Sequence, residues 1–226
     1  MQRLLSTLCL ALATQLAHAG VINFDDLGLG YFDPIASNYA DHGLNGNGDA
    51  RVGVRYSGSD GADDHLAFWY DNYGPLLNVA FTPTDGTMAE ITLTADHGWL
   101  IQSITFELAA WPTVDLAVWP AVDVDADVYY SIGGVNVDAP GMAILGLTAP
   151  HLNHFSLTNV AGAAVASMRW GTDWDVGIDN INFTVIRDPS VPLPAPGTLA
   201  LVTLGLGAAL RWGGARRSPA LGALRT

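Results

Sequence analysis

The 226-residue chain contains no lysine, and its single cysteine, Cys9, lies close to the N-terminus. One cysteine cannot form an intramolecular disulfide. The sequence also lacks a Gly-x-Ser-x-Gly elbow, a His-Glu-x-x-His pair and a phosphate-binding loop, which mark several common enzyme classes. We therefore predict a protein that is not an enzyme and that contains no disulfide.

Positive charge is scarce in the middle of the chain. All 22 acidic residues lie between residues 20 and 189, where the only basic side chains apart from histidine are Arg51, Arg55, Arg169 and Arg187. A field of this sign repels the phosphates of nucleic acids and favours solubility and cation binding. We expect no nucleic-acid partner.

The N-terminal 19 residues have the layout of a secretory signal peptide. Arg3 precedes an apolar run over residues 4–17, and Ala17 and Ala19 form an Ala-x-Ala cleavage site before Gly20. Such segments are removed on export. We therefore predict export, with Cys9 lost together with the signal peptide.

The C-terminal region predicts a membrane helix. A proline-rich spacer over residues 190–196 precedes an uncharged run over 197–210, and a helix extended to residue 215 approaches the roughly 20 residues that cross a bilayer. Arginines follow this run. The positive-inside tendency places residues 218–226 in the cytoplasm and the body of the chain outside.

This C-terminal pattern resembles a known sorting signal. The entry Val191, Pro192 and Pro194, the apolar helix over residues 197–217 and the cluster Arg211, Arg216 and Arg217 are similar to the PEP-CTERM signal of Gram-negative bacteria. The resemblance implies a tether in the inner membrane and an exosortase-type membrane protease as partner. It also implies delivery to the exopolysaccharide-rich cell surface or extracellular matrix.

The body of the chain, residues 20–189, has the pattern of β-strands. Apolar and polar residues alternate over 89–95 and 103–108, which is typical of strands with one buried face. Further strands are predicted over 21–24, 52–56, 66–70, 77–81, 114–119, 122–132, 154–157, 165–170 and 178–186. These strands do not alternate with helices as they would in a βαβ fold. The pattern therefore indicates an all-β domain, a single antiparallel β-sandwich of jelly-roll type.

Two carboxylates near the ends of the domain are predicted to face the core. The alternation that buries Ile22 and Phe24 also directs Asp26 inward, and that of Ile181 and Phe183 does the same for Asp179. A buried carboxylate requires hydrogen-bond donors or a cation. Three alternatives stay open: turn amides, a bulge that turns the carboxylate outward, or a structural Ca²⁺ ion bound by Asp25, Asp26 and Asp179. The Phe-Asp-Asp opening and the Gly-Ile-Asp-Asn-Ile close resemble the ends of carbohydrate-binding jelly rolls that hold such an ion.

Trp69, Tyr70, Trp111 and Trp174 are the candidates for a ligand-binding surface. Trp69 and Tyr70 are adjacent in a predicted strand, so one of them must face outward, and the other two lie in loop-like sequence. Flat aromatic faces stack on sugar rings. The alternative is that these rings belong to the core.

Together these features predict an exported, non-enzymatic component of the cell surface or matrix that associates with exopolysaccharide. One alternative is a carbohydrate-binding module with structural calcium. A second is a polysaccharide hydrolase, which the many carboxylates would permit.

Overall fold

The computed structural model describes residues 17–44, 48–58, 65–71, 73–84, 86–111, 124–144, 153–171 and 174–192. The chain divides into two units, Met1–Asp188 and Pro189–Thr226. The predicted sorting helix and its arginines lie outside the described residues, as does most of the signal peptide. Within the described ranges, no helix is long and apolar enough to span a membrane.

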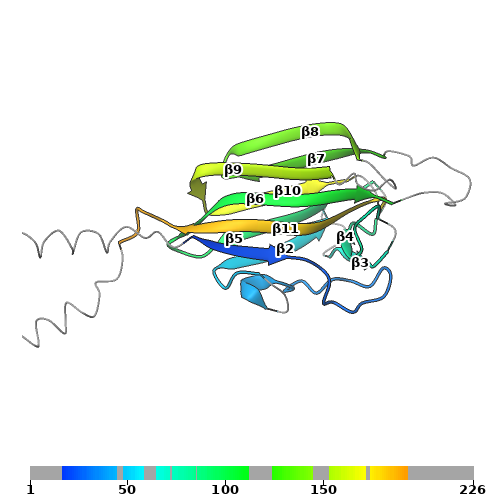
Figure 1. Cartoon of the computed structure of the whole chain (residues 1–226), viewed down its shortest axis with the longest axis horizontal. Helices are drawn as coiled ribbons and strands as arrows, with labels where there is room; N and C mark the ends of the chain where they lie inside the picture. The colour runs from blue at the N-terminus through cyan, green and yellow to red at the C-terminus, as the bar shows by residue number, and fades with distance from the viewer. Residues whose placement is uncertain are drawn as a thin grey trace, which may run out of the picture. The chain divides into compact units, whose positions relative to one another are not determined.

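The first unit is built from two antiparallel sheets (Figure 1). Sheet A has the order β3-β4-β11-β6-β9, and β1 also pairs with β11; its strands are β1 (His18–Ile22), β3 (Ala67–Trp69), β4 (Val79–Phe81), β6 (Trp99–Ala110), β9 (Asn153–Ala163) and β11 (Val176–Arg187). Sheet B has the order β2-β5-β10-β7-β8; its strands are β2 (Val52–Gly58), β5 (Ala89–Ala95), β7 (Val124–Ile132), β8 (Val135–Ile144) and β10 (Val165–Trp170). A short 3₁₀ helix, η1 (Asp41–Gly43), precedes β2.

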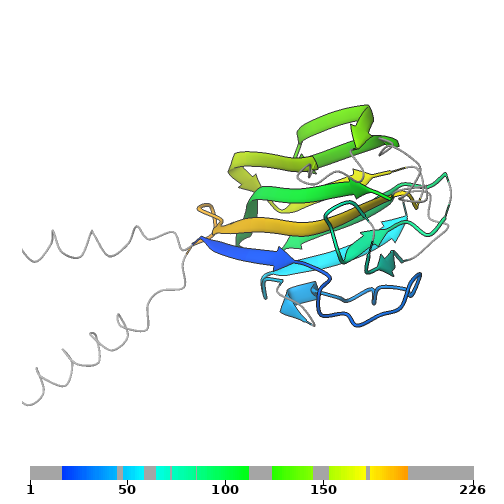
Figure 2. The ribbon, with the colours of Figure 1, turned by 45° about the vertical axis from the view of Figure 1, so that its right-hand side comes forward.

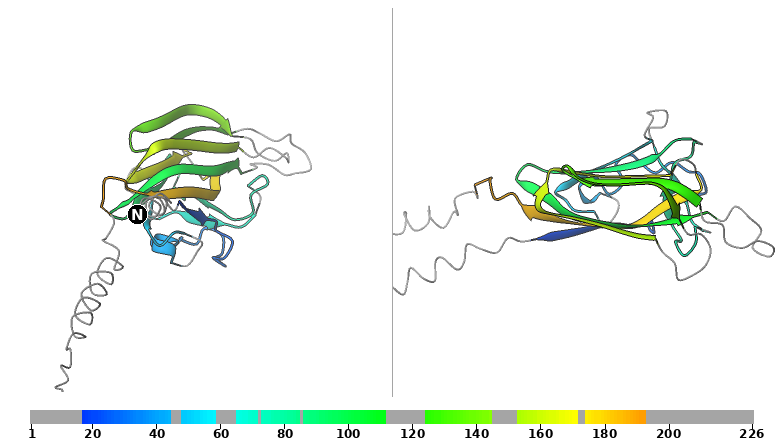
Figure 3. Two further views of the ribbon diagram at one scale, coloured as in Figure 1. Left: turned by 60° about the vertical axis from the view of Figure 1, so that its left-hand side comes forward. Right: turned by 90° about the horizontal axis from the view of Figure 1, so that it is seen from above.

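The two sheets form the layers of a sandwich, which Figure 3 shows from above. The core between them contains Phe106 and Phe183 from sheet A and Ile91, Met168 and Trp170 from sheet B, all buried. Alternation accounts for this arrangement, because every second residue of β5 and β10 is buried while its neighbours face outward. The prediction of an all-β antiparallel sandwich is confirmed.

The first and last strands are antiparallel neighbours. His18 lies opposite Val185, and Ile22 opposite Ile181, so the start of β1 and the end of β11 lie side by side (Figure 2). The same edge of β11 pairs with β4 at Ile178. Strand β11 therefore runs the length of the sheet. The folded chain begins and ends beside one end of this strand, and β3 and β4 lie at its other end.

The predicted strands differ from the observed ones mainly in length. The bounds 89–95 and 165–170 are confirmed, whereas β6 and β9 are longer than predicted. The sequence prediction missed β8 altogether. The predicted strand 114–119 lies outside the described residues.

Candidate functional site

Asp179 is one of two buried carboxylates among the described residues, with an exposed fraction of 5%; the other, Asp49, pairs with Arg51. Asp179 lies at a β-bulge in β11, and the next residue, Asn180, has a φ of 52° and donates its backbone N–H to Asp179 Oδ1 at 2.6 Å. Burial raises the pKa of Asp179 to about 7, while hydrogen bonds from the Asn180 and Phe24 amides lower it and the charges of Asp25 and Glu107 raise it further. The strand-parity prediction is confirmed for this residue.

Asp25 and Asp26 lie near this group but are exposed. The Tyr39 hydroxyl donates to Asp26 Oδ1 at 2.7 Å, and the side-chain amides of Asn23 and Asn78 donate to Asp25 at 3.0 and 2.7 Å. The prediction that Asp26 faces the core is wrong. The strand β1 ends at Ile22, so its alternation does not extend to residue 26.

The geometry gives calcium limited support. Asp25, Asp26 and Asp179 each accept a hydrogen bond from an N–H or O–H group. Within the described ranges, no three histidine, cysteine, aspartate or glutamate residues form a group that could hold a metal ion. The hydrogen-bonding alternative accounts for all three carboxylates, and the calcium ion stays a prediction.

The predicted ligand residues Trp69, Tyr70, Trp111 and Trp174 converge at the β3–β4 end of sheet A. The ring centroids of Trp69 and Trp111 are 4.6 Å apart, and those of Trp111 and Trp174 are 6.4 Å apart. The backbone explains the second contact, because the Trp111 N–H donates to the Asp175 carbonyl oxygen at 2.6 Å. The structure thus brings all four predicted residues into one group.

Two further rings, Tyr31 and Phe32, complete this group, which we call the aromatic cluster. Tyr31 stacks on Tyr70 with centroids 3.9 Å apart, and Phe32 meets Trp69 edge to face at 5.1 Å. Exposed fractions are 40% for Tyr31, 51% for Phe32 and 44% for Tyr70. Phe81 lies beneath Phe32 and Trp69 and is fully buried. The cluster is therefore a half-exposed aromatic surface on a packed base.

Asp71 fixes two rings of the cluster. The Tyr31 hydroxyl donates to Asp71 Oδ2 at 2.7 Å, and the Trp69 indole N–H donates to Asp71 Oδ1 at 2.9 Å. The Phe32 N–H also donates to the Phe68 carbonyl oxygen at 3.0 Å, which ties the loop of residues 31–32 to β3. These bonds set the ring orientations before any ligand arrives.

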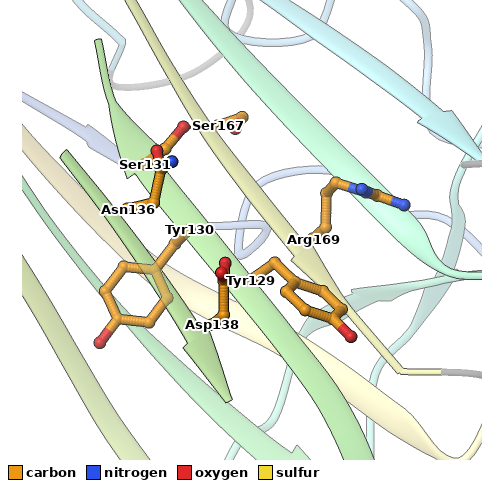
Figure 4. A pocket seen from close by; sticks show the side chains of 7 residues that line it. All are labelled: Tyr129, Tyr130, Ser131, Asn136, Asp138, Ser167 and Arg169. Atoms are coloured by element: carbon orange, nitrogen blue, oxygen red, sulfur yellow. Dashed lines mark hydrogen bonds between the residues drawn. The ribbon is translucent and has the colours of Figure 1, made fainter. Parts of the chain in front are cut away.

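The outer face of sheet B carries an open hollow of about 180 Å³ between β7, β8 and β10 (Figure 4). Its outward-facing lining consists of Tyr129, Ser131, Asn136, Asp138, Ser167 and Arg169. The adjacent Tyr130 points to the other side of β7 and packs against Phe106. None of the hollow's residues was predicted as a site, because their proximity depends on how three strands align.

Ala17 and Ala19 lie at the start of the described chain, both exposed. Ala19 belongs to β1 and pairs with Thr184. The predicted cleavage after Ala19 would leave Gly20 to Ile22 paired with β11.

Sequence reasoning missed that Tyr31, Phe32 and Asp71 join the tryptophans, although Tyr31 and Phe32 adjoin glycines and an aspartate in loop-like sequence.

No family model matches the chain, and no curated protein sequence matches it significantly. A solved structure, the enzymatically active domain of bacteriophage CBA120 tailspike protein 4, is similar at 12% identity and a TM-score of 0.25. The match covers 68% of this chain and 20% of the tailspike chain. A likeness of this size supports no inference about fold or function.

Proposed function

We propose that the protein is a non-enzymatic component of the bacterial cell surface or matrix, exported and sorted by a PEP-CTERM/exosortase-type system, whose aromatic cluster binds exopolysaccharide. The observation that carries the binding proposal is the stack of Tyr31 on Tyr70 beside Trp69, with Asp71 holding the Tyr31 and Trp69 side chains. The sorting proposal rests on the sequence of residues 191–217.

The chemistry of the aromatic cluster suits a sugar. Exposed ring faces of Tyr70 and Phe32 offer apolar contact to the C–H face of a pyranose, and the Asp71 carboxylate and the Tyr31 hydroxyl lie beside them as polar groups. The rings are already ordered by mutual stacking. Binding therefore requires little further ordering of side chains, which favours affinity.

The state of the carboxylates favours binding over hydrolysis. Glycoside hydrolysis needs an acid with a raised pKa at the scissile bond. Asp179 has a raised pKa, but it is only 5% exposed and its oxygens accept backbone N–H bonds, so a polysaccharide does not reach it. We therefore propose that polysaccharide is bound and not cleaved.

A jelly-roll classification of the sandwich is part of this proposal. From β4 to β11 the chain crosses between sheets at every connection except the one from β7 to β8. Repeated crossing of this kind is typical of double-sheet jelly rolls. Strands β3 and β4 form the edge of sheet A beyond β11; β3 carries Trp69 of the aromatic cluster, and β4 carries Phe81, which lies beneath it.

Binding is tested by affinity gel electrophoresis of the purified full chain in gels that contain a soluble polysaccharide. We expect Tyr70→Ala to weaken the retardation about two- to tenfold, the value of one aromatic stack. Val160, which is 81% exposed on β9, gives a control, because Val160→Ser removes an exposed apolar side chain away from the cluster. Equal retardation of the Tyr70 variant and the wild type would contradict the proposal.

Sorting is tested separately by mass spectrometry of the protein recovered from the surface of the native bacterium. We expect the C-terminal peptides that contain Arg216 and Arg217 to be missing from the surface form and present in the membrane precursor. An intact C-terminus on surface protein would argue against exosortase processing.

A further inference from the structure

We propose that the outer face of sheet B is a second saccharide-binding surface, and that its hollow takes one uncharged sugar unit of a polysaccharide. This inference rests on the proposed association with polysaccharide but uses residues outside the aromatic cluster. The two surfaces lie on different sheets, so each can be tested without the other.

Strand register places the side chains of the hollow in two rows across sheet B. In one row Asp138, Tyr129, Arg169 and Glu90 are successive partners on β8, β7, β10 and β5. In the other row Asn136, Ser131, Ser167 and Thr92 are partners on the same four strands. Each row thus runs perpendicular to the strands and presents one side chain per strand.

Alternation shows that both rows face away from the core. Val128 and Ile132 of β7 and Ala166, Met168 and Trp170 of β10 are fully buried, and Tyr130 packs against the core. The residues that alternate with them on β7 and β10, which are Tyr129, Ser131, Ser167 and Arg169, therefore point outward. Figure 4 shows the side chains of Tyr129 and Arg169 on the same side of the sheet. The hollow is therefore a surface site that an extended chain can reach.

The hollow combines an aromatic ring with both donors and acceptors. The Arg169 guanidinium carbon lies 5.8 Å from the centre of the Tyr129 ring, and the hydroxyl oxygens of Ser131 and Ser167 are 3.0 Å apart. Asn136 adds an amide and Asp138 a carboxylate. Sugars match this mixture, because their hydroxyls both donate and accept and their ring C–H groups pack on aromatic faces.

Charge argues for an uncharged sugar. Arg169 is the basic residue of the hollow, and its Nε lies 3.8 Å from Glu90 Oε2. Asp138 lies two positions along the same row. The charge of the Arg169 guanidinium is therefore already balanced by Glu90, and the Asp138 carboxylate would repel an anionic sugar. The volume of about 180 Å³ equals that of about six waters in bulk, which is the scale of one sugar ring.

The test uses the purified full chain in affinity gels that contain either an uncharged galactomannan or β-glucan, or anionic alginate. We expect retardation by an uncharged polysaccharide and about two- to tenfold weaker retardation of Tyr129→Ala. Tyr129→Phe keeps the ring and should behave as the wild type. Thermal melting of each variant verifies that its fold is intact, and Val160→Ser serves as the surface control.

The outcomes separate this inference from the proposed function. Weaker retardation of Tyr129→Ala with unchanged retardation of Tyr70→Ala would support the sheet B site and contradict the role of the aromatic cluster. Weaker retardation of Tyr70→Ala alone would overturn the sheet B site. Stronger retardation by alginate than by either uncharged polymer would overturn the proposed sugar class, and absence of retardation by any of the three would overturn both surfaces.

Discussion

Tyr31 and Tyr70 stack with their ring planes inclined by only 15° and their centroids 3.9 Å apart, although they lie in separate loops. Asp71 accepts a hydrogen bond from the Tyr31 hydroxyl and so joins one loop to the other. The stack depends on a contact between side chains, since neither tyrosine belongs to a strand. Its orientation is therefore sensitive to a single carboxylate.

Replacing Asp71 by alanine should loosen the aromatic cluster. The change removes the acceptor for both Tyr31 and Trp69, and we expect a loss of about 1–2 kcal/mol in the free energy of unfolding together with a weaker near-ultraviolet circular dichroism signal. Urea unfolding measures the first effect. Asp71→Asn keeps one acceptor oxygen, so its free energy of unfolding should fall less than that of Asp71→Ala. An equal fall in both variants would show that loss of the hydrogen bonds does not cause the destabilisation.

Asp179 should make the folded protein less stable as pH rises. Its pKa is about 7 when folded and 3.8 as the ordinary value, so between these pH values the folded state holds a proton that the unfolded state has lost. Stability therefore falls from about pH 4 to about pH 7, by up to about 4 kcal/mol from this group, and then levels off. Asp179→Asn should remove this component.

Urea unfolding of the wild type and Asp179→Asn at pH 5 and pH 8 measures the difference. The comparison between the two proteins cancels the contributions of the other carboxylates. A stability difference between wild type and variant that is equal at the two pH values would contradict the raised pKa.

Gly20 should not tolerate a side chain. A Cβ atom at this position would lie 2.2 Å from Phe183 Cζ, because the aromatic ring covers the backbone of β1. We expect Gly20→Ala to lower the melting temperature, with a cost of about 1–3 kcal/mol from overpacking. In a double-mutant cycle Phe183→Leu should relieve part of this cost, and strict additivity of the two changes would contradict the steric explanation.

The predicted calcium ion is tested by thermal melting in calcium and in chelator. An ion bound only to the folded state raises the melting temperature. Because calcium would compete with the proton on Asp179, the increase should be larger at pH 8 than at pH 5. Identical melting temperatures with calcium and with chelator at both pH values would remove the ion from consideration.

Local alternation predicted the strands that lie inside the sheets but missed β8. The residues of β5 and β10 alternate without interruption, so their bounds follow from the sequence. In β8 the dipeptide Pro140-Gly141 is typical of a turn. This strand is an edge of sheet B, where proline is tolerated because one side of the strand has no partner to hydrogen-bond.

The candidate sites were predictable only in part, for a related reason. The loop-like context of Trp111 and Trp174 indicated accessible rings, yet nothing local to Tyr31 predicts that it lies on Tyr70. The hollow depends on the register of β7 with β8, which shifts at an irregularity between Ala126 and Val128. A shift of one residue would turn Asp138 to the other face, and a single sequence does not specify that alignment.

The pairing of β1 with β11 has a practical consequence for immobilising the domain. Both chain ends of the folded unit leave beside the His18–Val185 pair, whereas Trp174 and Trp111 lie beyond Val176 at the other end of β11. The 12 residues of that strand make 11 steps of about 3.3 Å, which separate the two ends by about 36 Å. A bead, dye or fusion partner attached through either end would therefore leave the aromatic cluster unobstructed.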